Sequence, residues 1–124
     1  MRQLLCALLF LVLASLAPAQ VQADPADIAA ASRSVVRVVV FAANGDNVPI
    51  GHGSGIVVAP DRILTNAHVV AEEEYDGAIR VMVIPSETGG PIAAEVIARS
   101  PRNDLALIAL RNGRRLTPAA LFTG

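Results

Sequence analysis

Hydrophobic residues in the middle of the chain fall into short runs, rich in valine and isoleucine, that polar, glycine or proline residues separate. Each run is too short for a typical helix, and its β-branched residues favour a strand. The pattern predicts six strands, at residues 34–43, 50–59, 62–66, 78–84, 92–98 and 105–110.

Turn-forming residues connect these predicted strands. The sequence NGDN at residues 44–47 joins the first two strands as a hairpin, and PSETGG at 85–90 and SPRND at 100–104 supply later turns. Short strands joined in this way, with almost no helix, are typical of an antiparallel barrel or sandwich. Because closure removes exposed sheet edges, we predict an all-β fold with a six-stranded antiparallel barrel.

Three segments outside the predicted strands complete this outline. Residues 24–33 start with Asp-Pro and are rich in alanine, which favours a short amino-terminal helix or lead-in to the barrel at 34–110. Residues 67–74 have the character of a helical turn. Residues 111–124 begin with polar RNGRR and show no clear period, so we interpret them as the start of a linker.

The first residues have the pattern of a secretory signal peptide, which we assign to residues 1–23. Arg2 precedes an apolar run over residues 4–16, and small residues follow. We place the cleavage after Ala23, with cleavage after Ala19 as the alternative. An uncleaved membrane anchor is disfavoured, because the run is shorter than the ~20 apolar residues that a spanning helix needs.

Composition narrows the possible functions. The only cysteine, Cys6, lies within the predicted signal peptide, so the mature chain has no disulfide and no thiolate metal site. All ten basic residues are arginines and are balanced by eleven acidic residues, so the sequence predicts no basic stripe and no nucleic-acid binding. We expect no cofactor and no metal.

Three motifs occur in order along the predicted barrel: GHGSGIVV at residues 51–58, ILTNAHVV at 63–70 and NDLALIAL at 103–110. This ordered set resembles the first barrel of trypsin-like (chymotrypsin-fold) serine proteases, and most closely the bacterial HtrA/Deg-type members. Animal members place a cysteine after the motif histidine, whereas this chain has Val69. The resemblance implies the amino-terminal half of a two-barrel protease that acts on proteins or peptides and is exported, to the periplasm or the medium of a bacterium.

The resemblance also implies catalytic roles for His68 and Asp104. A serine hydroxyl becomes a good nucleophile when a positioned imidazole accepts its proton, and His68 is the candidate general base. Asp104 is the candidate for holding that imidazole in one tautomer. Without the other motifs, we would interpret His68 as an ordinary loop histidine and Asp104 as a turn aspartate that satisfies its own backbone.

Other chemically tempting residues have simpler interpretations. Ser54 lies in a predicted strand and lacks the Gly-x-Ser-Gly surroundings of the family's nucleophile, which Ser86 and Ser100 also lack. His52 is more consistent with a strand surface than with a metal pair, because ligand spacing is missing around it. The run Glu72-Glu73-Glu74 is interpreted as a solvated face and not as a cation site.

The sequence leaves three functional interpretations open. We favour a serine endopeptidase of which this chain is an incomplete amino-terminal part, with the serine and the second barrel supplied by missing sequence; the chain alone should then be inactive and expose apolar surface near His68 and the last strand. The first alternative is a noncatalytic exported peptide-binding module or pseudoprotease. The second is an unrelated barrel, in which His68 and Asp104 lie too far apart to hydrogen-bond.

Overall fold

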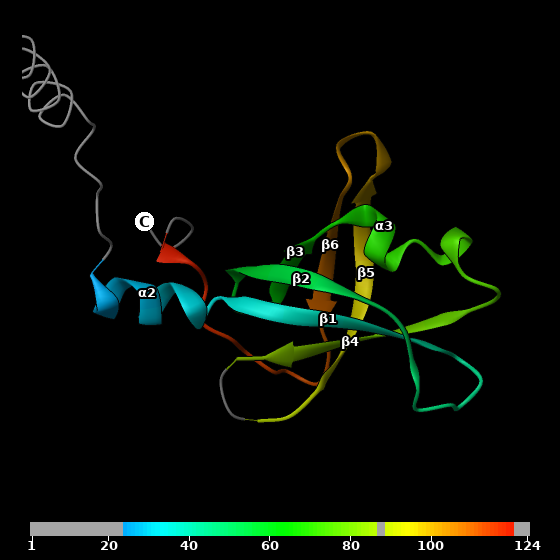
Figure 1. Cartoon of the computed structure of the whole chain (residues 1–124), viewed down its shortest axis with the longest axis horizontal. Helices are drawn as coiled ribbons and strands as arrows, with labels where there is room; N and C mark the ends of the chain where they lie inside the picture. The colour runs from blue at the N-terminus through cyan, green and yellow to red at the C-terminus, as the bar shows by residue number, and fades with distance from the viewer. Residues whose placement is uncertain (1–23, 87–88, 121–124) are drawn as a thin grey trace, which may run out of the picture.

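Six antiparallel strands form a closed barrel in the computed structural model, which describes residues 24–86 and 89–120 (Figure 1). The strands are β1 (Val35–Ala42), β2 (Pro49–Ala59), β3 (Arg62–Thr65), β4 (Ile79–Pro85), β5 (Ile92–Ser100) and β6 (Leu105–Leu110). They pair in the order β1-β2-β3-β6-β5-β4, and β4 returns to pair with β1. The predicted all-β class and six-stranded antiparallel barrel are therefore confirmed.

Short helical segments precede the first strand and connect later strands. They are α2 (Pro25–Ser32), α3 (Ala67–Val70), and the 3-10 turns η1 (Glu72–Glu74) and η2 (Pro101–Asn103). The helical turn predicted at 67–74 is divided into α3 and η1 because Ala71 adopts an extended conformation, with φ −75° and ψ 109°. The predicted signal peptide lies outside the described residues.

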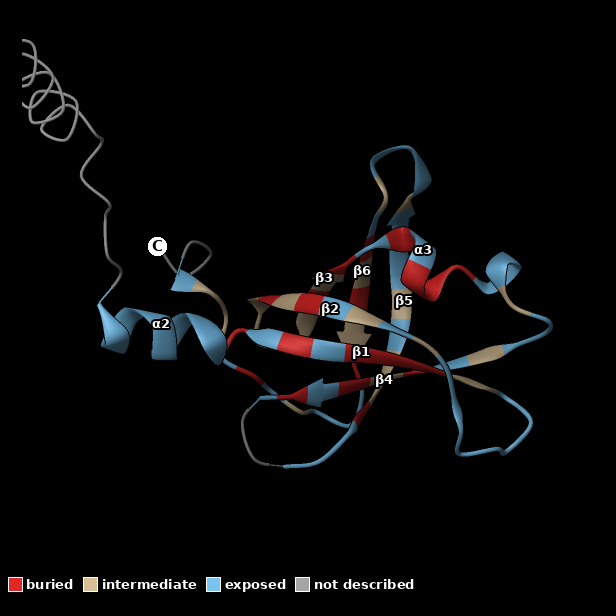
Figure 2. Ribbon diagram, in the orientation of Figure 1, coloured by how far each residue is buried: buried red, intermediate tan, exposed pale blue. Residues whose placement is uncertain are grey.

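Helix α2 stands apart from the core. The Asp24 side chain accepts a hydrogen bond from the Ala26 N–H at 3.0 Å, and Pro25 occupies the first turn, where its missing N–H costs nothing. None of the helix residues is buried, as Figure 2 shows by its pale colour. Within the described residues, no helix combines the length and the apolar character needed to cross a bilayer.

Alternation along the strands places one face of each strand inside the barrel. On β1, Val36, Val38 and Val40 point inward and are almost completely buried. Ile63, Ile92 and Ile108, from β3, β5 and β6, fill the same interior and are at most 2 % exposed. β-Branched side chains from four strands thus form one core, which fixes the register of the strands.

The segment after β6 returns to the barrel. Leu116 is only 8 % exposed and packs with the core valines and isoleucines. Its N–H donates to the Pro60 carbonyl at 2.7 Å, and the Ser34 hydroxyl donates to the Thr117 carbonyl at 3.0 Å. The described part of the segment predicted as a linker therefore covers one end of the barrel.

Leu116→Ala should lower the free energy of unfolding by about 2 to 4 kcal/mol, because it removes a buried side chain and leaves a cavity. Ile28→Ala, on the exposed α2 helix, is the matched control and should change it by less than about 0.5 kcal/mol. Urea unfolding of the purified protein, followed by circular dichroism, measures both values. Equal effects of the two substitutions would mean that residues 111–120 do not contribute to the core.

Candidate active site

The ILTNAHVV motif places His68 at the rim of the barrel by burying the residues around it. The Thr65 hydroxyl is buried at the end of β3 and donates to the Ser54 carbonyl of β2 at 2.8 Å. After Asn66, the chain turns into α3, in which Ala67, Val69 and Val70 are buried. His68 is the one exposed residue of this four-residue helix, so its ring projects from a well-anchored segment.

Contacts with β2 hold α3 against the barrel. A Cβ atom at Gly53 would lie 2.6 Å from Val69 Cγ2, so only glycine leaves room for Val69 at this position. The Tyr75 hydroxyl donates to the Val69 carbonyl at 2.7 Å, and the phenol ring lies against Gly51, where a Cβ atom would overlap the hydroxyl. Sequence reasoning missed Tyr75, which lies between the helical turn predicted at 67–74 and the strand predicted at 78–84.

Asp104 owes its position to an unusual backbone conformation. It follows η2 and adopts the left-handed region, with φ 52° and ψ 46°, while its N–H donates to the Pro101 carbonyl at 3.2 Å. Aspartate tolerates this region better than most residues because its side chain is short and polar. Asn66 reinforces the position, since its Nδ2 donates to the Asp104 carbonyl at 3.2 Å.

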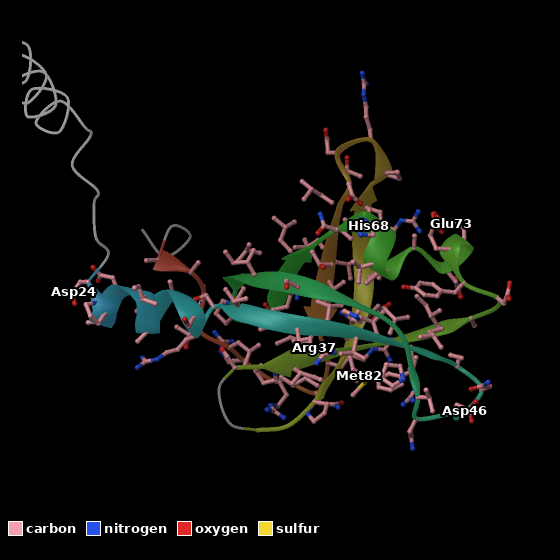
Figure 3. The ribbon with its side chains drawn as sticks, viewed as in Figure 1. Asp24, Arg37, Asp46, His68, Glu73 and Met82 are labelled. Carbon is pink, nitrogen blue, oxygen red and sulfur yellow. The ribbon has the colours of Figure 1, made fainter. Side chains whose placement is uncertain are left out.

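His68 and Asp104 meet through two hydrogen bonds to one carboxylate. The His68 N–H donates to Asp104 Oδ1 at 2.9 Å, and His68 Nδ1 lies 2.7 Å from Oδ2. Figure 3 shows His68 on α3 at the rim, beside the turn between β5 and β6. The wide separation expected for an unrelated barrel is therefore not observed.

The electrostatics of the pair follow from these bonds. The hydrogen bond from the His68 backbone N–H, followed by the bond from its imidazole, lowers the pKa of Asp104. An ionised carboxylate accepts hydrogen bonds only, so the proton of a neutral His68 resides on Nδ1. His68 Nε2 has no hydrogen-bond partner among the described residues, and the imidazole is 66 % exposed. The arrangement presents a basic nitrogen outward.

The other candidate residues lie elsewhere in the structure. Ser54 and His52 are exposed on β2, as expected for a strand surface. The Ser86 hydroxyl donates to the Ser32 carbonyl at 2.8 Å, and the Ser100 hydroxyl accepts from Asn103 at 3.0 Å. No serine in residues 24–86 or 89–120 is hydrogen-bonded to His68.

The glutamate run beside α3 is only partly a solvated face. Glu73 forms a two-pronged ion pair with Arg99 of β5, at 2.5 and 3.0 Å, which links η1 to the barrel wall. The side-chain hydrogen bond from Arg99 lowers the pKa of Glu73. No group of three potential metal-ligating side chains is present in the described part of the chain.

An apolar hollow lies beside the turn that carries Asp104, with Ser100 and Leu105 from the two ends of that turn in its lining. It has a volume of about 180 Å³, and Leu64, Leu105 and Leu107 contribute to its lining. Leu105, directly after Asp104, is 39 % exposed. This matches the apolar surface that the sequence predicted near the last strand.

Acid should weaken the contribution of Asp104 to stability. Its pKa is lower in the folded protein than in the unfolded chain, so the contribution is complete above the unfolded value and is lost as pH falls through the folded value. We therefore expect Asp104→Asn to destabilise the protein near pH 6 and to have little effect near pH 2. Urea unfolding across this range checks the prediction, and a pH-independent difference would contradict it.

Tyr75→Phe should lower the free energy of unfolding by about 1 kcal/mol, because the Val69 carbonyl loses its side-chain partner. It should also shift the imidazole NMR signals of His68, since α3 loses one of its anchors. His68 signals that remain in place would show that Tyr75 supports the fold without positioning the histidine.

Comparison with known proteins identifies the family of this barrel. The sequence pattern of the trypsin-like peptidase domain matches residues 53–123, which is more than half of the chain. The serine protease Rv3671c of Mycobacterium tuberculosis H37Rv is 37 % identical over 83 residues, which are 67 % of this chain and 19 % of that protein. Serine protease MT3772 of the CDC 1551 strain shows the same identity and coverage.

Solved structures show the same likeness. The crystal structure of Deg5 superposes with a TM-score of 0.59 and 29 % identity, over 76 % of this chain and 45 % of that one. A mutant, inactive form of Rv3671c from M. tuberculosis H37Rv superposes with a TM-score of 0.52 and 31 % identity, over 73 % and 40 % of the two chains. The chain thus spans about a fifth of the length of the curated relatives that it matches. It belongs to the trypsin-like peptidase domain family of serine proteases, and its barrel is of the HtrA type.

Proposed function

We propose that this chain is the amino-terminal part of a serine endopeptidase that hydrolyses peptide bonds in proteins, with His68 and Asp104 as two members of its triad. The bond between His68 Nδ1 and Asp104 Oδ2, at 2.7 Å, carries the proposal. It supplies an oriented imidazole whose second nitrogen is available on the surface. Family membership supports a protein or peptide as the substrate.

In this mechanism, His68 Nε2 accepts the proton of a serine hydroxyl as that oxygen attacks the peptide carbonyl. The imidazolium that forms is stabilised by the Asp104 carboxylate, and the proton then passes to the leaving amine. The second hydrogen bond, from the His68 N–H to Oδ1, fixes the carboxylate relative to α3. Asp104 can therefore orient the ring without a further partner.

The nucleophile and the oxyanion hole belong to a second barrel in our proposal. The stretch that matches this chain is 19 % of each curated relative, so a protein of the relatives' length has ample room for a second barrel. Residues 1–23 would direct export, residues 34–110 would form the first barrel, and residues 111–124 would lead towards the second barrel. The apolar hollow beside Asp104 supports this arrangement, because its leucines suit burial against another domain.

Reading the gene beyond the codon for Gly124 tests the proposal directly. A downstream Gly-x-Ser-Gly-Gly sequence is expected, and the encoded protein should react with a fluorophosphonate probe at that serine. A stop codon with no second barrel would overturn the proposal.

In the complete gene product, His68→Ala should lower kcat by about 10⁶-fold, because the serine loses its base, and Asp104→Asn by about 10⁴-fold, because the imidazole is no longer held in the correct tautomer. Asp46→Asn, in the exposed turn between β1 and β2, is the matched control and should leave kcat unchanged. Peptide hydrolysis measured at saturating substrate gives these values. Unchanged rates for both triad variants would rule out the assigned roles.

A noncatalytic peptide-binding module is the second candidate. The observation that favours it is that no serine of the described residues is hydrogen-bonded to His68, so no hydroxyl in this part of the chain is placed for activation by the imidazole. This candidate predicts that the protein binds unfolded clients and that His68→Ala leaves the binding unchanged.

A further inference from the structure

The outer face of β1, β2 and β4 has a composition that neither the fold nor the proposed catalysis explains. Cross-strand register places ten side chains on this face, four from β1, three from β2 and three from β4. They are Val35, Arg37, Val39 and Phe41, then His52, Ser54 and Ile56, and finally Arg80, Met82 and Ile84. Two are arginines, one is a histidine, most of the others are apolar, and none is acidic.

The arginines of this face lack ionic partners. Four ion pairs are present in the described residues, and neither Arg37 nor Arg80 takes part in any of them. Arg80 instead lies over the ring of Phe41, with its guanidinium carbon 5.2 Å from the ring centroid. Both arginines are exposed, and Figure 3 shows Arg37 and Met82 on neighbouring strands.

Two hollows lie side by side on this face because Ile84 lines both of them. The first, of about 670 Å³, includes Val35, Arg37 and His52 in its lining. The second, of about 280 Å³, includes Phe41, Arg80 and Met82. Val39 and Met82, which pair with each other, lie midway between the two cationic positions; Val39 is 3 % exposed and Met82 is half-buried.

The spacing of the arginines matches an extended chain. Arg80 is opposite Phe41, which lies four residues after Arg37 along β1. At ~3.3 Å per residue, the two positions are about 13 Å apart along the strand. Residues i and i+4 of an extended peptide have the same separation and point to the same side, with residue i+2 between them.

We propose that this face binds an extended peptide segment with acidic residues at positions i and i+4 and an apolar residue at i+2. The acidic residues pair with Arg37 and Arg80, whose donors suit carboxylates, and the apolar side chain covers Met82, which lies midway between them. A second copy of this chain is a poorer occupant, because its equivalent face is also cationic. The proposal concerns binding alone and does not depend on the proposed protease activity.

The test uses the purified protein and a fluorescein-labelled nonapeptide with glutamates at positions 3 and 7, isoleucine at position 5 and serines elsewhere. Fluorescence anisotropy at low salt should show saturable binding. Arg37→Gln combined with Arg80→Gln should weaken it at least tenfold. The control pair, Arg102→Gln with Arg115→Gln, makes the same change in net charge at exposed positions outside both hollows and should weaken binding less than twofold.

Control peptides separate a specific site from general charge attraction. Replacing both glutamates with glutamine should abolish binding, and replacing the isoleucine with serine or placing the glutamates side by side should weaken it severalfold. Equal binding of the adjacent-glutamate peptide, or equal loss in both arginine pairs, would overturn the proposal. Binding to phosphatidylglycerol vesicles without binding to the peptide, or dimerisation that the Arg37 and Arg80 changes abolish, would also overturn it.

Two measurements keep this proposal distinct from the catalytic one. Circular dichroism shows whether each variant is folded, and both arginines are exposed, so their replacement should leave the spectrum unchanged. The titration is repeated with His68→Ala. Peptide affinity should be the same in this variant, so a failure of catalysis and a failure of binding give different results.

Discussion

Hydrogen bonding between β3 and β6 is the constraint on which the candidate active site depends. The two strands pair from Arg62 opposite Ala109 to Thr65 opposite Ala106, so the end of β3 lies beside the start of β6. His68 follows the end of β3, and Asp104 directly precedes the start of β6. The pairing therefore brings two residues that are 36 positions apart in sequence into contact. A shift of this register by one residue would reverse the inward and outward faces of β6 and separate the pair.

Support for the pair comes from backbone geometry as much as from side chains. The Val69 side chain anchors α3 against β2 because Gly53 leaves space for it, and the Tyr75 hydroxyl donates a hydrogen bond to the Val69 carbonyl. Asp104 contributes a left-handed backbone that aims both carboxylate oxygens at α3. The histidine and aspartate are both well exposed, so their alignment rests on these anchors and not on burial of the pair itself.

Much of the fold could be predicted from local sequence because each strand carries its own signal. Valine and isoleucine runs between glycine and proline turns located all six strands, and β6 was predicted with the bounds that the structure shows. The motifs located His68 and Asp104, and the structure brings them together; their catalytic roles stay a proposal. The motif residues Thr65 and Asn66 also proved to have structural partners that explain their position.

Contacts distant in sequence could not be predicted in the same way. Tyr75 and Gly51 have no periodic signal that relates them, and the ion pair of Glu73 with Arg99 joins a turn to a strand far along the chain. Leu116 follows a polar segment that resembles a linker, yet closure of the barrel creates the apolar site that it fills. Each of these contacts exists only once the strand order is fixed.

Strand β1 shows how one short sequence serves two surfaces. Its valines at 36, 38 and 40 complete the core, which leaves Arg37 and Phe41 on the outside by alternation alone. The core therefore places no demand on the identity of these outward residues. Other polar residues would serve the core equally well at these positions. Arg37 opposite Ile84, and Arg80 over the ring of Phe41, instead create a cationic, partly apolar face. Their composition is better explained by something that binds the outer surface than by the barrel that carries it.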